Sequence, residues 1–304
     1  MMKHQDIVIE PPKDVEEVIN TLNRFARSGE YVFRGYGKQS EILPNIIRGK
    51  TSYVDVESEL LHNFEKYGSN YFNANTPIDF MSYAQHFGLP TRLLDFTYNP
   101  FIALSFALYT DKGNGDYKEI EDKTYYYVRF ASLKENLCIP YIPLNDKLYH
   151  MELTRTESLA TKACQCIGSV TDLFGENALG RNVQSLGIEG TIEEKQNEQK
   201  KLKDKVILFI APNQSNQRLI MQQGLFMFPY TLDKTEHLKI LKNNSAVIKI
   251  HKDFRSDLNQ YLDTLGYNTF RLMPDLSSIC GAVKRRIIDE RKNKSTNFKK
   301  KGGK

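Results

Sequence analysis

Tryptophan is absent from this 304-residue chain, cysteine occurs four times, and no apolar run approaches the ~20 residues that a membrane-spanning helix needs. The first residues, MMKHQDIVIEPPKD, turn acidic and contain prolines where a signal peptide would need its apolar stretch. We therefore expect a cytoplasmic protein that makes no contact with a membrane.

The cysteines, Cys138, Cys164, Cys166 and Cys280, are scattered, which is typical of a reducing compartment and argues against a disulfide scaffold. Cys164 and Cys166 lack the two-residue gap of common zinc-binding pairs, and no second pair follows them. The six histidines do not cluster. We therefore predict buried thiols and no metal site.

The net charge of +5 is concentrated at the end of the chain. Residues 284–304 carry ten Lys or Arg against Asp289 and Glu290, which leaves 32 basic and 35 acidic residues in the rest. The body therefore offers no basic surface for nucleic acid. Residues 292–304 have no apolar periodicity and are expected to form a disordered basic tail, which is also where a nucleic-acid contact would be made.

Apolar periodicity predicts alternating helices and strands. Helices are expected over about 15–25, 56–67, 80–87, 100–108, 258–265 and from 276, and strands over 31–36, 92–96, 125–130, 206–211 and 246–250. The fold class is therefore α+β: one mixed domain over 1–291 with a central strand core flanked by helices. A helical or mobile insertion is expected at about 145–204, where 192–204 is dense in Glu, Lys and Gln.

The chain has no GxGxxG, GxxxxGK[ST], HExxH or GxSxG motif. Polar residues instead interrupt an apolar stretch, with Gln85 and His86 followed by Arg92 and Asp95 in LPTRLLDF. Buried charges need partners, so we predict that Arg92 and Asp95 pair, either to orient the strand or to serve catalysis. His86 is expected at a helix end, facing a cleft.

Four segments resemble, in order, the motifs of the FRG domain family: Phe33-Arg34-Gly35, AQHFGLPTRLLDFTYNPFIALSFAL from Ala84, QRLIMQQGLF from Gln217, and MPDLSSI from Met273. FRG domains occur in bacterial and phage genomes. The resemblance therefore implies a bacterial protein, with a role in phage defence.

A weaker likeness is to ADP-ribosyltransferases, whose first strand ends in an Arg-Gly pair like Arg34-Gly35 and whose last motif carries a glutamate. Here that position resembles Gln222-Gln223, and glutamine cannot act as a carboxylate base. The resemblance implies an ADP-ribosyltransferase-like fold in which NAD is a substrate and no other cofactor is required. The residues assigned to catalysis are His86, Asp95 and Gln223, and those assigned to substrate binding are Arg34, Gly35, Gln85, Thr91, Arg92 and Arg218.

Three functions follow from these residues. NAD-directed or ADP-ribosyl chemistry ranks first, sensing of a nucleotide or phosphate ligand without turnover second, and nucleic-acid binding or cleavage last. The first two predict a small nucleotide as partner and require Arg34, His86, Arg92, Asp95 and Gln223 to converge on one cleft.

Overall fold

The computed structural model describes residues 5–49, 53–71, 77–108, 124–139, 207–211, 217–229, 232–276, 279–284 and 287. The insertion expected at about 145–204 and the basic tail expected at 292–304 both lie outside these residues. Within the described part of the chain, no helix is long and apolar enough to cross a membrane.

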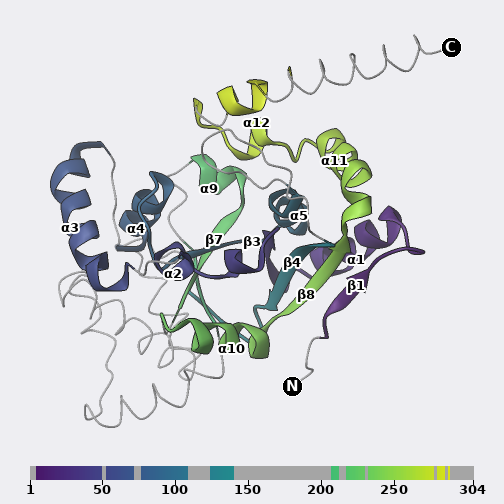
Figure 1. Cartoon of the computed structure of the whole chain (residues 1–304), viewed down its shortest axis with the longest axis horizontal. Helices are drawn as coiled ribbons and strands as arrows, with labels where there is room; N and C mark the ends of the chain where they lie inside the picture. Colours follow the sequence, from purple (N-terminus) through teal and green to yellow (C-terminus); the bar gives the residue numbers. More distant parts are fainter. Residues whose placement is uncertain are drawn as a thin grey trace, which may run out of the picture.

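An eight-stranded mixed sheet runs through the described residues in the order β1-β8-β4-β2-β3-β7-β6-β5 (Figure 1). Its strands are β1 (Ile7–Ile9), β2 (Tyr31–Tyr36), β3 (Leu94–Thr97), β4 (Tyr125–Ser132), β5 (Leu137–Ile139), β6 (Leu208–Ile210), β7 (Gly224–Phe228) and β8 (Ala246–His251). The two outermost pairs, β1–β8 and β5–β6, are parallel, and the inner pairs are antiparallel.

The helices are α1 (Val15–Ser28), α2 (Asn45–Arg48), α3 (Glu57–Gly68), α4 (Pro77–His86), α5 (Pro100–Leu108), α9 (Gln217–Met221), α10 (Lys234–Asn244), α11 (Arg255–Thr264) and α12 (Thr269–Leu272). The 3-10 helices are η1 (Gln39–Ile42), η2 (Val54–Val56), η3 (Ser69–Tyr71) and η5 (Lys252–Phe254).

Local chemistry explains where the helices nearest the site begin and end. The Asp14 side chain accepts the Glu17 N–H at 3.1 Å and caps α1, which ends at the left-handed Gly29. Asn99 caps α5 by accepting the Phe101 N–H at 2.9 Å, directly before Pro100. Both helix starts agree with the sequence prediction.

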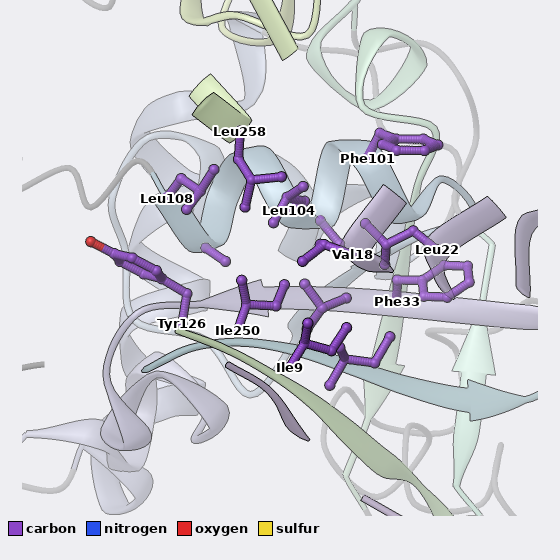
Figure 2. Packing of buried hydrophobic residues seen from close by; sticks show 14 of the residues in the cluster. Ile9, Val18, Leu22, Phe33, Phe101, Leu104, Leu108, Tyr126, Ile250 and Leu258 are labelled. Atoms are coloured by element: carbon purple, nitrogen blue, oxygen red, sulfur yellow. The ribbon is translucent and has the colours of Figure 1, made fainter. Parts of the chain in front are cut away.

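Helices cover both faces of the sheet (Figure 1). On one face, α1, α5 and α11 pack over β4, β2 and β8, and Figure 2 shows Val18, Leu104 and Leu258 from these helices above the sheet. On the other face, Ile240 and Leu241 of α10 pack against apolar residues of β2, β3 and β7. Every residue of α5 with a described side chain is buried except Phe106, because this helix has apolar neighbours on nearly all sides.

This architecture confirms the predicted α+β class and the predicted helices that correspond to α1, α3, α4, α5 and α11. The strands that were not predicted are β1, β5 and β7, and the helices that were not predicted are α2, α9, α10 and α12. Strand β7, GLFMF, is buried at every position, so it lacks the polar alternation of a half-exposed strand. Helix α10 has only a short apolar stripe along a lysine-rich segment.

Candidate functional site

A pocket opens where two neighbouring strands separate. Strands β2 and β3 share one bridge, between Phe33 and Thr97, and beyond it no further pair of the described residues connects them. The pocket has a volume of about 270 Å³. Its lining consists of Phe33, Arg34, Gly35, Glu41, Arg48, Asp95, Phe96, Thr97, Phe106, Arg218, Gln222 and Met273.

Arg34 links the two separated strands through its side chain. Its Nη1 donates to the Asp95 carbonyl at 2.6 Å, and its Nε and Nη2 donate to the Glu41 carbonyl at 3.2 and 2.7 Å. Burial lowers the pKa of Arg34 to about 10, although the nearby Asp95 carboxylate opposes that shift. Arg34 thus remains charged at pH 7 and holds β2, β3 and η1 together through two main-chain carbonyls.

Arg48 supplies a second guanidinium that donates to the Glu41 carbonyl, which Arg34 also contacts. Its Nη2 donates to the Glu41 carbonyl at 3.3 Å, and its Nε donates to the Leu43 carbonyl at 2.9 Å. Burial lowers the pKa of Arg48, and the carboxylates of Glu41 and Asp95 raise it. The Glu41 carboxylate itself accepts the main-chain N–H groups of Gly37 and Lys38 at 2.9 and 3.1 Å. Arg34 and Arg48 therefore lie side by side with their cationic ends at the pocket.

Gly35 is required by the packing of α5. A Cβ at this position would lie 1.6 Å from the Ala103 carbonyl oxygen and 2.8 Å from the Ala107 nitrogen. The main chain of Gly35 borders the pocket, but the space left by its missing side chain is filled by the helix backbone. The missing side chain therefore lets α5 approach β2, and the assignment of Gly35 to substrate binding stays a prediction.

Asp95 places an exposed carboxylate at the pocket. The side chain is 60% exposed, its Oδ1 accepts the Gln85 amide N–H at 2.7 Å, and its Oδ2 lies 3.8 Å from Arg34 Nη1. The Gln85 amide is oriented in turn by the buried Thr91, whose hydroxyl donates to Gln85 Oε1. Gln85 and Thr91 thus support Asp95.

The predicted pair of Arg92 and Asp95 is wrong. Arg92 pairs with Glu57, the first residue of α3, with 2.6 Å between Nη2 and Oε2 and 3.0 Å between Nε and Oε2. Glu57 is 1% exposed, and Arg92 also lies over the Phe228 ring. Arg92 and Asp95 are three residues apart, and in an extended segment that spacing directs their side chains to opposite faces. Glu57 comes from a helix that is distant in sequence, so the spacing of residues could not identify it as the partner. Arg92 is absent from the pocket lining.

His86 lies at the end of α4, as predicted, and its Nδ1 is 3.4 Å from Arg218 Nη1. Burial, followed by the charge of Arg218, lowers the pKa of His86, while Asp275 raises it. His86 is thus neutral at pH 7 and able to accept from Arg218, which lines the pocket from α9. His86 itself contacts the site through Arg218 and is not part of the lining.

The structure places Gln222 at the pocket and Gln223 outside its lining. Gln223 is exposed, takes a left-handed conformation with φ of 46°, and accepts the Tyr98 N–H through its main-chain carbonyl. Gln222 is 8% exposed. A tight turn between α9 and β7 thus rotates the two adjacent side chains apart, a difference that the sequence QQG does not reveal.

The predicted convergence therefore holds for some residues and fails for others. Arg34, Gly35, Asp95 and Arg218 border the pocket, and Gln85, Thr91 and His86 lie behind it. Arg92 and Gln223 are outside. The lining residues that were missed include Glu41, Arg48, Thr97, Gln222 and Met273. Thr97, Gln222 and Met273 lie in segments that resemble FRG motifs, and this was the sequence signal for them. In the described ranges, no group of three or more His, Cys, Asp or Glu could hold a metal ion.

The fold and the site define an α+β domain with an arginine-lined pocket at a break in its central sheet. The FRG domain family model matches residues 29–115, a range that includes β2 and α5. An FRG domain is therefore present in the chain over these residues. No curated protein and no solved structure matches it.

Proposed function

We propose that the pocket binds a phosphate-bearing nucleotide, and that the chain acts on it through NAD-directed or ADP-ribosyl chemistry. One observation carries the proposal: Arg34 and Arg48 donate to one carbonyl oxygen and face the same pocket, with Arg218 also in its lining. The family resemblance adds the expectation of a role in phage defence.

Like charges at this separation repel each other, and each is already partly removed from water. Arg48 contributes to the lowered pKa of Arg34, after burial. Among the described residues, Arg48 forms no ion pair with a carboxylate, and Arg34 has one carboxylate oxygen at 3.8 Å. A phosphate group between the two guanidiniums would offset this repulsion.

The guanidiniums also retain donors for such a ligand. A guanidinium has five N–H groups. Arg34 commits three of them to protein carbonyls and Arg48 commits two. The remaining donors, on a planar group that stays charged, suit the tetrahedral oxygens of phosphate.

Asp95 supplies the chemistry in this proposal. In hydrolysis of NAD, a water molecule would attack the anomeric carbon while the Asp95 carboxylate accepts its proton. The glycosidic C–N bond breaks, and its electron pair neutralises the pyridinium nitrogen of the departing nicotinamide. Transfer to an acceptor hydroxyl would follow the same balance, with that hydroxyl in place of water. The carboxylate is suited to either step because Gln85 orients one oxygen and leaves the other exposed.

Ligand sensing without turnover is the second candidate. It is favoured by Gln222, which lines the pocket and belongs to the Gln222-Gln223 pair found where ADP-ribosyltransferases would carry a glutamate. In that case Asp95 would help to bind the ligand and no bond would break. Nucleic-acid binding or cleavage ranks last, because no group of three or more His, Cys, Asp or Glu among the described residues could hold the metal ions of a two-metal nuclease site.

The test compares binding of NAD, ADP-ribose and ATP to the native protein and to Arg48→Gln by calorimetry. We expect Arg48→Gln to weaken binding about tenfold or more, because it removes a charge-assisted contact. Arg27→Gln, a matched change at an exposed position of α1, should leave affinity unchanged. If none of the three nucleotides binds the native protein at millimolar concentration, the proposal is wrong.

Incubation of the binding nucleotide with the native protein and with Asp95→Asn separates the two candidates. Release of nicotinamide by the native protein that is lost in Asp95→Asn supports catalysis. Tight binding without any product supports sensing.

A further inference from the structure

The main chain around Gln222 holds its side chain at the pocket. The Gln222 N–H donates to the Arg218 carbonyl at 2.9 Å, and its carbonyl accepts the Thr97 hydroxyl at 2.7 Å. The chain then turns at Gln223 into β7. Gln222 is thus tied to α9 on one side and to β3 on the other.

The amide of Gln222 has a defined orientation. Its Nε2 donates to the Leu272 carbonyl at 2.8 Å and lies 3.4 Å from Met273 Sδ. A carbonyl oxygen only accepts, so the amide nitrogen must lie on the Leu272 side. The amide oxygen Oε1 then points away from Leu272 and accepts no hydrogen bond from the described residues.

The pocket therefore has two chemically different sides. Arg34, Arg48 and Arg218 supply donors and positive charge, whereas Gln222 Oε1 and the Asp95 carboxylate supply acceptors. A bare phosphate satisfies the first side and leaves the second unmatched. A ligand that carries hydroxyl or amide N–H donors beside its phosphate satisfies both.

We propose that Gln222 is a specificity-determining residue that accepts a hydrogen bond from a hydroxyl or amide donor of the ligand. The ligand class is then a sugar phosphate or nucleotide, as distinct from a simple phosphate ester. This inference rests on the proposed phosphate-binding function and adds to it the group that is recognised next to the phosphate.

The experiment measures affinities for two probes with the same anionic group, methyl phosphate and ribose 5-phosphate. We expect the native protein to bind ribose 5-phosphate more tightly, because methyl phosphate has no hydroxyl donors. Gln222→Met keeps the side-chain length but removes the Oε1 acceptor, together with the Nε2 donor to the Leu272 carbonyl. It should weaken ribose 5-phosphate about tenfold and leave methyl phosphate unchanged. A purely structural role for Gln222 would weaken both probes alike.

Gln260→Met serves as the control, because Gln260 is exposed on α11 and the same substitution there should change neither affinity. The assignment to Gln222 would be overturned if Gln223→Asn lowered the affinity for ribose 5-phosphate and Gln222→Met did not. Should Gln222→Met fail to fold, the two probes on the native protein still decide: equal affinities overturn this inference and leave phosphate binding standing. Binding of neither probe overturns this inference, whereas the proposed function is decided by the calorimetry with NAD, ADP-ribose and ATP.

Discussion

Arg34 shows how one side chain can carry a structural and a binding role together. Its position near the end of a predicted strand, beside Gly35, suggested a ligand contact, and Arg34 does border the pocket. Three of its N–H groups nevertheless donate to the carbonyls of Asp95 and Glu41. These carbonyls belong to β3 and η1. The Arg34 side chain thus connects β2 to β3 beyond Phe33, where the described residues of the two strands have no main-chain pairing.

We expect Arg34→Lys to lower the melting temperature of the ligand-free protein, corresponding to a loss of about 2–3 kcal/mol in the free energy of unfolding. Lysine keeps the charge but cannot donate to both carbonyls in the plane of a guanidinium. Thermal unfolding followed by circular dichroism measures the loss. Arg27→Lys, on the exposed surface of α1, is the control and should change the melting temperature little. If Arg34→Lys also melted at the temperature of the native protein, the contacts of Arg34 with the two carbonyls would be dispensable.

Helix α5 and strand β2 fit together because small groups meet at their contact. Gly35 faces Ala103 and Ala107, both fully buried, so the backbones of helix and strand approach closely. This contact sets the distance between β2 and α5 and thereby fixes one wall of the pocket, where Phe106 lies.

Gly35→Ala should destabilise the fold by more than about 3 kcal/mol, because the added methyl group would overlap the backbone of α5, which cannot move without separating helix and sheet. Gly29→Ala is the matched control. Gly29 has a φ of 64° but nothing within 4 Å of the added methyl group, so the expected loss is about 1–2 kcal/mol of backbone strain. Denaturant unfolding of both variants gives the comparison, and a smaller loss for Gly35→Ala would contradict the packing.

Helix α3 is joined to the segment before β3 by the buried pair of Glu57 and Arg92. The segment LPTRLLDF predicted that Asp95 is the partner of Arg92, and breaking a buried pair carries a large energetic penalty. Because Asp95 is mostly exposed and Glu57 is buried, that penalty belongs to Glu57.

Glu57→Gln should lower the free energy of unfolding by about 3–5 kcal/mol, since it leaves Arg92 charged and buried without a carboxylate. Asp95→Asn should reduce it by less than about 1 kcal/mol. Glu59→Gln, the same change on the exposed side of α3, is the control. Chemical denaturation distinguishes these outcomes, and similar losses for Glu57→Gln and Glu59→Gln would contradict the buried pair.

The whole molecule responds to pH through a histidine that joins two distant segments. His237 of α10 is fully buried and its Nε2 lies 3.2 Å from the Ile42 carbonyl of η1, so Nε2 carries the proton of the neutral ring. Burial lowers the pKa of His237 to about 4, and the charges of Arg34 and Arg129 act in the same direction, against the bond to Ile42. His237 therefore holds the segment that carries Glu41 beside the pocket.

Because the folded-state pKa of His237 is below its ordinary value of 6.5, the unfolded chain gains its proton first as the pH falls. His237 therefore costs no stability above about pH 6.5, and the free energy of unfolding falls as the pH drops from 6.5 towards 4. The loss is about 2 kcal/mol at pH 5. His237→Gln keeps an N–H donor without a titrating ring and should reduce the loss of stability between pH 7 and pH 5 by that amount. His62→Gln, exposed on α3, should not reduce it, and unfolding curves at the two pH values provide the measurement.

At the same scale, the sheet is assembled from strands that are remote in sequence. Strand β1 pairs with β8, and β3 pairs with β7, with register partners Asp95 and Phe226. The residues of the pocket come from 33–48, 95–106, 218–222 and 273, and these segments meet because β2, β3 and β7 are adjacent in the sheet.

The sequence by itself determined the α+β class, many of the helix and strand positions and the presence of an FRG domain, because apolar periodicity, caps such as Asn99 and long motifs act over short distances. It also indicated Arg34, Asp95 and Arg218 as site residues. The tertiary structure alone decided that Glu57 is the partner of Arg92, that α5 occupies the space beside Gly35, that Arg48 joins Arg34, and that Gln222 faces the pocket. Each of these depends on the direction of a side chain relative to a remote segment, which packing sets and local sequence does not encode.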